Sequence, residues 1–411
     1  MKRIHQIMEY VQEHKLYPNI RVVDSAPETK IKTGGKDAVM FCANSYLGLV
    51  KHPKLIEAAI EATKKYGVGA NGSRVISGNL DIHREFEKKM AKFMEADDTI
   101  LFSNGYMANV GVIPALMNPL KVTASSFFER RAVILSDELN HASIIDGIRL
   151  SKAKAVVFKH NDTKDLEKKL KKYKGRRKMV VVDGVFSMDG DIAPLPEIVR
   201  LCKKYDAISM VDEAHAMGVL GKNGQGTLEY FGLKAMKDVD IVMGTCSKSM
   251  SAIGGYVVAS QEVIDYLRVA SRSYMFSVGI TPATAATLVA ALEVIQSEPE
   301  RRVQLRKNIK RLKGGLSKLG FYLYGGEIID DLSVAPIVPV LIGKDEDAVI
   351  FAEKLYDRGF FAPCVRWPAV AKNKARLRLT LMATHTPEQI DGLIKACEEV
   401  AKELKMDLVK K

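Results

Sequence analysis

Several features that commonly decide a protein's class are missing from this sequence of 411 residues. No apolar run is long enough to span a bilayer, and the stretch Met1 to Lys15 predicts an amphipathic helix without the apolar core of a signal peptide. The 5 cysteines are scattered and form no Cys-x-x-Cys pair, which argues against a disulfide framework and against a zinc site. Internal repeats and low-complexity tracts are also lacking. We therefore predict a globular, metal-free protein of the reducing cytoplasm.

Acidic residues are fewer than basic residues, and this difference bears on which kind of molecule the protein could bind. Lys plus Arg number 62 against 49 Asp plus Glu, so the net charge is +13. A basic protein is a candidate for nucleic-acid binding. Here, however, the basic residues are interleaved with acids in segments such as Lys164–Lys178 and Arg301–Lys318, which indicates solvated helix faces. We expect no nucleic acid; a polyanionic small molecule, such as a phosphorylated cofactor or coenzyme A, is the weaker functional interpretation of the charge.

From Thr99 onward, short apolar runs alternate with helical segments. Strands are expected at 100–102, 132–135, 155–158, 179–182, 207–211 and 241–243. Repeated units of this kind predict an α/β fold, with a mostly parallel sheet covered by helices on both faces. After about Pro282 a long helix, Ala283 to Lys318, leads into a smaller α+β domain. The predicted division is an N-terminal arm at 1–45, a large domain at 46–285 and a small C-terminal domain at 286–411.

Polar clusters follow most of the predicted strands. Ligands bind at the carboxyl ends of the strands in such sheets, so these clusters are expected to meet at one edge. The clusters are Ser103-Asn104-Gly105-Tyr106, Asp137-Glu138-Leu139-Asn140-His141, Asp183-Gly184-Val185-Phe186-Ser187 and Asp212-Glu213-Ala214-His215.

Lys248 stands at the end of the last of these strands. The run Ile241 to Met243 indicates a strand buried on both faces, and Gly244-Thr245-Cys246-Ser247 forms a polar turn before the lysine. Burial disfavours the ammonium form, so a lysine here is a poor choice for stability alone. The same surroundings suit a lysine that loses its proton and attacks a carbonyl group. The alternative is a surface lysine that begins the next helix.

Glycine marks two candidate binding turns. Gly105-Tyr106 lies where a strand passes through small residues into a helix, and this arrangement predicts a phosphate site made of backbone N–H groups and the helix dipole. Gly67 to Arg74 is a glycine-rich loop, either a flexible turn or a backbone that approaches a ligand or partner chain closely. It lacks the phosphate-loop pattern that ends in Gly-Lys-Ser/Thr.

Arg376 and Arg378 lie in a segment, Arg376 to Leu381, in which polar and apolar residues alternate. As a strand, this segment places both arginines and Thr380 on one face and the leucines on the other. The face is either the solvated side of an edge strand or an arginine fork for a carboxylate.

Taken together, Lys248, Asp212 and the Gly105-Tyr106 turn meet the requirements of pyridoxal phosphate. The lysine would form the imine, and the carboxylate would keep the ring nitrogen protonated so that the ring accepts electrons. A neutral aromatic side chain such as His141 would stack on the ring.

At this point the sequence resembles a known family, the α-oxoamine synthases among the fold-type I pyridoxal-phosphate enzymes. The resemblance covers about Asn44 to Ile394. The motifs that carry it are Asn44-Ser45-Tyr46-Leu47-Gly48-Leu49, Gly72-Ser73-Arg74, Asn140-His141-Ala142-Ser143, Asp183-Gly184-Val185-Phe186-Ser187-Met188-Asp189-Gly190-Asp191, Asp212-Glu213-Ala214-His215, Gly244-Thr245 with Ser247-Lys248, and Arg376-Leu377-Arg378.

The resemblance implies a role for each matching residue. Lys248 holds the cofactor and moves protons, Asp212 pairs with the pyridine nitrogen, and His141 stacks on the ring. His215 and Ser187 contact the side of the ring that carries its hydroxyl. The implied phosphate ligands are Gly105, Tyr106 and Thr245, with Ser277 reaching the phosphate of a neighbouring subunit. The implied ligands of the amino acid carboxylate are Arg378 and Asn44.

The family joins a small amino acid to an acyl-CoA and releases CoA and CO₂, as homodimers with active sites at the subunit interface. Several motifs resemble bacterial serine palmitoyltransferases, so L-serine and a long-chain acyl-CoA are the first expectation; these motifs are Ser247-Lys248-Ser249 with Ile253-Gly254-Gly255, Met217, and Leu381 to Thr386. The alternatives are 8-amino-7-oxononanoate synthase, which uses alanine and a pimeloyl thioester and is closer at Gly67–Gly78 and Arg376–Leu381, and glycine C-acetyltransferase. An aminotransferase with the same cofactor is a more distant alternative.

One segment departs from the family pattern. Asn118 to Arg131 is longer than the loop usual before the Asp137 strand. Three hypotheses are open: the segment covers the acyl entrance, makes peripheral membrane contact through Phe127-Phe128, or has no role.

Overall fold

The computed structural model describes residues 1–13, 20–120, 131–325, 330, 332, 334–406 and 408. Its central element is a seven-stranded sheet with the strand order β3-β9-β8-β7-β6-β4-β5. The strands are β3 (Asp98–Phe102), β4 (Val133–Asp137), β5 (Lys154–Phe158), β6 (Lys178–Asp183), β7 (Ile208–Asp212), β8 (Ile241–Thr245) and β9 (Gly255–Ala259). The predicted fold class is confirmed, because β4 to β8 pair in parallel.

β9 is the exception to the parallel order, since it runs antiparallel to both β8 and β3. The sequence prediction did not include this strand. The chain between Thr245 and Gly255 is too short for the helical crossover that a parallel neighbour of β8 would need, so the chain reverses instead.

Both faces of the large sheet are buried at its central strands, whereas the edge strand β5 is partly exposed. Within β6, Met179 and Val181 belong to one apolar cluster, whereas Val180 and Val182 belong to another. Successive side chains of a strand point to opposite faces, so helices on both sides produce the uninterrupted apolar runs seen in the sequence. The helices up to α10 are α1 (Lys2–Glu13), α2 (Pro53–Tyr66), α3 (Asp81–Phe93), α4 (Gly105–Met117), α5 (Ala142–Ser151), α6 (Thr163–Lys172), α7 (Leu195–Tyr205), α8 (Thr227–Tyr230), α9 (Gln261–Ala270) and α10 (Arg272–Met275).

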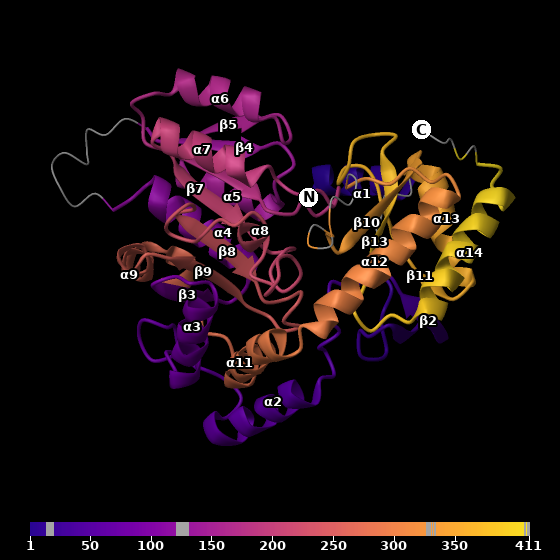
Figure 1. Ribbon diagram of the computed structural model, residues 1–411, viewed down its shortest axis with the longest axis horizontal. Helices are drawn as coiled ribbons and strands as arrows, with labels where there is room; N and C mark the ends of the chain where they lie inside the picture. Colours follow the sequence, from indigo (N-terminus) through magenta and orange to yellow (C-terminus); the bar gives the residue numbers. More distant parts are fainter. Residues whose placement is uncertain are drawn as a thin grey trace.

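The C-terminal part packs beside the large sheet, as Figure 1 shows. It contains an antiparallel sheet with the order β10-β13-β12. Its elements are α12 (Glu300–Lys318), β10 (Ile337–Gly343), α13 (Asp345–Asp357), β11 (Phe360–Phe361), β12 (Cys364–Val365), β13 (Ala375–Thr380) and α14 (Pro387–Glu403). β13 lies in the middle of this sheet, so the edge-strand interpretation of the arginine segment is wrong.

The single long helix expected from Ala283 to Lys318 is instead two helices, α11 (Pro282–Ser297) and α12. The break falls at Glu298 and Pro299. Proline has no backbone N–H and its ring collides with the preceding turn, so the first helix ends just before it. α11 packs against α2 and α3, whereas α12 leads to the C-terminal sheet (Figure 1).

A third small sheet, β1-β2-β11, connects the N-terminal segment with the C-terminal part of the chain. β1 (Lys30–Thr33) and β2 (Lys36–Met40) form a hairpin around Gly34 and Gly35, which both have positive φ. This turn sets the register of the hairpin, in which Thr33 pairs with Lys36. β2 then pairs in parallel with β11. The domain boundaries themselves stay a prediction.

Candidate active site

A cavity of about 260 Å³ opens at the carboxyl ends of the central strands. Parallel strands bring their carboxyl ends to one edge, so clusters far apart in sequence meet there. The residues that line the cavity are Asn104, Gly105, Tyr106, His141, Ser143, Asp183, Val185, Ser187, Asp212, Ala214, His215, Met243, Thr245, Ser247 and Lys248. The structure thus brings together eight predicted cofactor residues, whereas Ser277 and the two predicted carboxylate ligands are not in this lining.

Lys248 reaches this cavity from the turn after β8. The residue is partly buried and lines the cavity. Burial lowers the pKa of Lys248 to about 8, although the nearby carboxyls of Asp212 and Asp183 act in the opposite direction. A lysine with this pKa has a substantial neutral fraction near physiological pH, which a nucleophilic amine needs.

Asp212 and Asp183 end neighbouring strands and are directly paired in the sheet register. Asp212 is 3% exposed and accepts hydrogen bonds from Asn109 Nδ2 at 2.9 Å and from the Ala214 amide at 3.0 Å. Burial and the charge of Asp212 raise the pKa of Asp183 well above its usual value. The paired carboxyls therefore avoid carrying two negative charges, and two donors orient the carboxylate of Asp212.

His141 is the N-cap residue of α5 and lines the cavity. Its Nδ1 lies 2.8 Å from Ser143 Oγ, and its backbone N–H donates to Asp183 Oδ2 at 3.1 Å. Burial, aided by the charge of Lys248, lowers the pKa of His141. A neutral imidazole held at both its backbone and its ring is suited to stack on a flat aromatic ligand.

His215 is also neutral, because burial and then Lys248 hold its pKa well below the ordinary value. Its Nδ1 lies 2.6 Å from the hydroxyl oxygen of Tyr46, a fully buried side chain. When the Tyr46 hydroxyl donates to Nδ1, the proton of the neutral ring must be on Nε2, where it can be donated to a ligand.

The start of α4 forms a cradle for an anion. Asn104 caps the helix by accepting from the Met107 amide at 2.9 Å, and Gly105 and Tyr106 line the cavity beside Thr245. A Cβ on Gly105 would lie 3.0 Å from Thr245 Cβ and 3.1 Å from Thr245 Oγ1. The absence of that atom keeps the backbone open, and the free N–H groups and the helix dipole favour a phosphate. These residues fit a phosphorylated aromatic cofactor.

Arg376 and Arg378 point from β13 toward the loop that follows β6. Arg376 NH1 donates to Asp189 Oδ1 at 2.7 Å and to the Met188 carbonyl at 3.1 Å, and Arg376 is 4% exposed. Arg378 instead donates from Nε to the Ser187 carbonyl at 2.7 Å and from NH1 to Asn44 Oδ1 at 3.3 Å. Arg376 is therefore occupied by a protein carboxylate, whereas Ser187 and Asn44 offer Arg378 neutral oxygens.

Ser277 lies apart from the cavity lining. Its hydroxyl donates to the Ser273 carbonyl at 2.5 Å and is 3.5 Å from Ser103 Oγ. Ser103 immediately precedes the Asn104 cap, so Ser277 stands behind the phosphate cradle of its own chain. Its role toward a neighbouring subunit stays a prediction.

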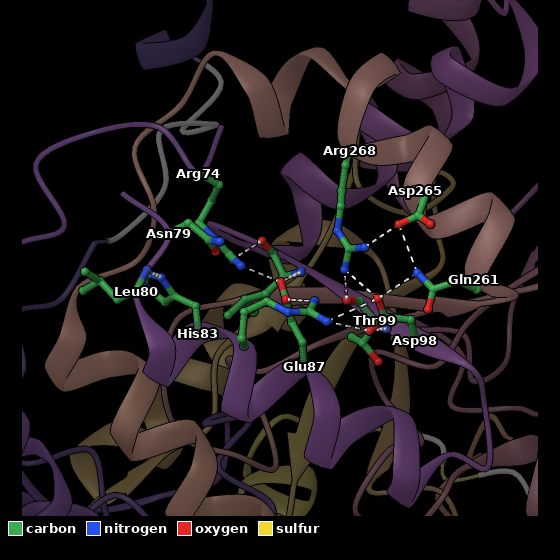
Figure 2. A network of polar contacts seen from close by, with 12 residues as sticks. Arg74, Asn79, Leu80, His83, Glu87, Asp98, Thr99, Gln261, Asp265 and Arg268 are labelled. Atoms are coloured by element: carbon green, nitrogen blue, oxygen red, sulfur yellow. Dashed lines mark hydrogen bonds and ion pairs between the residues drawn. The ribbon is translucent and has the colours of Figure 1, made fainter. Parts of the chain in front are cut away.

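The glycine-rich loop is anchored by Arg74 (Figure 2). This buried side chain donates to Glu87 Oε1 at 2.9 Å and to Asn79 Oδ1 at 2.8 Å. Glu87 also accepts from the Leu101 amide of β3 at 3.0 Å. The loop is therefore tied to the strand that leads into the phosphate cradle, and it is not simply a flexible turn.

Two contributors to the site had no role in the sequence prediction: Asn109 and Tyr46. Asn109 holds Asp212, and Tyr46 contacts His215. The available signal for Asn109 was a single amide in the otherwise apolar stretch Ala108 to Met117, four residues after Gly105 and thus on the same helix face. Tyr46 lies inside one of the family motifs, but its partner is distant in sequence.

Among the described residues, no group of three or more His, Cys, Asp or Glu side chains is arranged to hold a metal ion. None of the helices in the described ranges has the length and apolarity needed to cross a membrane. The segment 121–130, which contains most of the predicted insertion and Phe127-Phe128, lies outside the described residues.

Comparison with known proteins gives consistent matches along the chain. Residues 36–397 match the family model described as aminotransferase class I and II. The 8-amino-7-oxononanoate synthase of Lysinibacillus sphaericus is 43% identical over 403 residues, covering 98% of each chain, and that of Thermoanaerobacter pseudethanolicus is 42% identical over 403 residues, covering 98% of this chain and 97% of the relative. Among solved structures, serine palmitoyltransferase from S. paucimobilis with bound PLP and myriocin matches with a TM-score of 0.89 and 34% identity, covering 98% of this chain and 97% of that one.

Proposed function

This chain belongs to the aminotransferase class I and II family, and on that premise we propose that it is an α-oxoamine synthase whose substrates are L-alanine and a pimeloyl thioester. It is a PLP-dependent acyltransferase that joins a small amino acid to an acyl thioester, with loss of CO₂ and the thiol. The observation that carries the reaction class is the meeting of Lys248, Asp212 and the Gly105 cradle in one cavity, whereas the substrate pair rests on the named relatives.

The first expectation, serine with a long-chain acyl-CoA, is less well supported than its alternative. Relatives that are 42–43% identical over almost the whole chain are named 8-amino-7-oxononanoate synthase, whereas the matched serine palmitoyltransferase structure is 34% identical. The same fold and site are compatible with both reactions. The structural likeness therefore supports the reaction type, and the choice of substrate pair rests on the sequence relatives.

Pyridoxal phosphate, when bound, supplies an electron sink for the bond that is broken at the α-carbon of the amino acid. The phosphate would be held by the N–H groups at Gly105 and Tyr106 and by the Thr245 hydroxyl. Asp212 would place its negative charge beside the ring nitrogen, His141 would cover one face of the ring, and His215 and Ser187 would bind its hydroxyl side. Lys248 would bind the cofactor and, in its neutral form, accept the α-proton at Nζ.

The amino acid carboxylate would be bound by the guanidinium of Arg378, with Asn44 fixing the orientation of that group. A planar fork can bind a carboxylate through two parallel hydrogen bonds and so set the plane of the substrate. Orientation matters because only a bond perpendicular to the cofactor ring can pass its electrons into the ring.

The decisive test is release of free thiol on mixing the purified protein with an amino acid and an acyl-CoA. L-alanine with pimeloyl-CoA is expected to give the highest kcat/KM, and L-serine with palmitoyl-CoA and glycine with acetyl-CoA serve as comparisons. A higher kcat/KM for L-serine with palmitoyl-CoA would overturn the proposed substrates but would leave the reaction class unchanged. Transfer of the amino group without thiol release would instead indicate an aminotransferase.

We also propose a homodimer in a reducing compartment. Exposed apolar side chains gather on and beside the glycine-rich loop, among them Val68 (83% exposed), Ile76 (85%) and Phe276 (71%), and such patches commonly mark interfaces. All five cysteines are free, as expected where thiols are kept reduced. Analytical ultracentrifugation of the wild type and of a Val68→Asp, Ile76→Asp double variant tests the dimer, with a shift to monomer expected for the variant.

A further inference from the structure

His160, just after β5, lies between two carboxylates outside the cavity. Its Nδ1 is 3.0 Å from Asp137 Oδ1 at the end of β4, and its Nε2 is 2.7 Å from Asp191 Oδ2. The ring also meets the Phe186 ring edge-on, with 4.5 Å between centroids. The side chain of His160 is only 21% exposed.

This geometry requires a charged imidazole. A neutral ring has one N–H and could donate to only one carboxylate, whereas the imidazolium donates to both. Burial by itself would lower the pKa of His160, but the hydrogen bonds and charges of Asp137 and Asp191 outweigh that effect and raise it to about 10. His160 is therefore a fixed cation at neutral pH.

Asp191 closes the loop 186–191. The Phe186 amide donates to the Asp191 carbonyl at 3.0 Å, and the Gly190 amide donates to the Phe186 carbonyl at 2.8 Å. Asn161 Nδ2 also donates to Asp191 Oδ2, at 2.7 Å. One side of this loop is thus bound to the large sheet through His160 and Asn161.

The other side of the same loop holds the arginines of β13. The Ser187 carbonyl accepts from Arg378 Nε at 2.7 Å, and Asp189 binds Arg376. Gly190 has a φ of +68°, and a Cβ there would lie 2.8 Å from the Ile337 carbonyl of β10. The loop therefore lies tightly between the large sheet and the C-terminal sheet, and its Ser187 carbonyl binds the Nε side of the Arg378 guanidinium.

We propose that His160 is a positioning residue for amino acid recognition, which acts by fixing the 186–191 loop and, through it, the orientation of Arg378. The inference rests on the proposed role of Arg378 in binding the carboxylate. His160 itself touches neither the cavity nor the arginine; its influence is carried by Asp191 and by the Ser187 carbonyl.

The experiment measures the dissociation constants of L-alanine and L-alaninamide from the cofactor-loaded enzyme by the absorbance change of the bound cofactor. The two ligands share the amino group, and only alanine has the carboxylate. His160→Gln is expected to weaken alanine binding about tenfold and to change alaninamide binding by less than about twofold. Asp191→Asn removes the charge of one partner of the imidazolium at a partly exposed position. It is also expected to weaken alanine binding more than alaninamide binding. If His160→Gln does not fold, Asp191→Asn is used for the comparison in its place.

Arg268→Gln is the matched control (Figure 2). Arg268 also bridges two carboxylates, with 2.6 Å to Asp98 Oδ2 and 2.6 Å to Asp265 Oδ1, and its side chain is 24% exposed. It lies on α9, away from the loop. This variant is expected to lower the melting temperature while leaving the ratio of the two dissociation constants unchanged.

Two outcomes separate this inference from the proposed function. If Arg378→Lys reduces the preference for alanine over alaninamide but His160→Gln and Asp191→Asn do not, the positioning role is overturned and the role of Arg378 stands. If Arg378→Lys leaves the preference intact, the proposed role of Arg378 fails, and the inference about His160 fails with it. An equal loss of both ligands in His160→Gln would also overturn the positioning role.

Discussion

Arg376 and Asp189 form a partly buried ion pair with 2.7 Å between NH1 and Oδ1. The two arginines of β13 share a strand face, so their alternation in sequence does not distinguish them. The ion pair does, because an arginine already bound to a protein carboxylate is a poor ligand for a second one. Arg378 therefore is the better candidate for the substrate.

The first prediction concerns this pair of arginines. Arg378→Lys should weaken amino acid binding by about 2–5 kcal/mol, because a point charge replaces a fork in a partly desolvated pair. Cofactor affinity should be unchanged. The measurement is an amino acid titration of the cofactor absorbance. Arg376→Lys is the control, and a larger loss for this control would assign the carboxylate to Arg376.

Lys248→Ala should abolish turnover. The variant removes both the amine that binds the cofactor and the group proposed to accept the α-proton, and a positioned proton acceptor alone accounts for roughly 100-fold or more in rate. Thiol release is the measurement, and circular dichroism checks the fold. Thiol release at the wild-type rate by a folded variant would show that the reaction does not need Lys248.

The pKa of Lys248 also predicts a pH dependence of stability in the cofactor-free protein. Because the folded state lowers this pKa from 10.5 to about 8, folding disfavours the ammonium form. The penalty is fully present below about pH 8, and it disappears as the pH rises toward 10.5, since the unfolded chain binds the extra proton in that window. Lys248→Met should therefore raise the free energy of unfolding at pH 7 by about 1–3 kcal/mol and by less at pH 10. Urea titrations of the cofactor-free wild type and variant at the two pH values test this; an equal difference at both would contradict the assigned cause.

Asp212→Asn should slow loss of the α-proton more than it weakens cofactor binding. The amide is similar in size but lacks the charge that stabilises a protonated ring nitrogen, and loss of one preorganised electrostatic partner commonly costs roughly 100-fold in rate. The measurement is exchange of the alanine α-proton with deuterated water, followed by NMR. Exchange at the wild-type rate would show that Asp212 is not the ring nitrogen's partner.

Tyr46→Phe tests the hydrogen bond to His215. The phenyl ring fills the same space, but His215 Nδ1 loses its hydrogen-bond partner, which should cost about 1–3 kcal/mol for an unsatisfied buried group. We expect kcat to fall about tenfold, with a smaller change in the KM for the amino acid. A fall in stability with unchanged kcat would make Tyr46 a purely structural residue.

The location of the site can be predicted from the sequence because it depends on local patterns. Apolar runs predict strands, and the parallel connections place the ends of those strands at one edge, so Lys248, Asp212 and His141 can be brought together without knowledge of any contact. The break at Pro299 is also present in the sequence, but the helical pattern on both sides of it favours one helix.

Other contacts could not be predicted in this way, because they join residues that are far apart in the chain. Tyr46 and His215 are separated by 169 positions, and Arg378 and the Ser187 carbonyl by 191. No periodicity or propensity relates such residues, and their distance depends on how the C-terminal sheet packs against the large sheet.

The sequence by itself determined the fold class, the family and the chemical groups of the site, since these follow from local patterning and motif order. Only the tertiary structure decided which arginine is free of a protein carboxylate, which side chains hold Asp212 and His215, and that His160 is a cation. Each of these properties depends on the interaction energy between a side chain and the partners that packing brings close to it. The residue type alone therefore does not predict it.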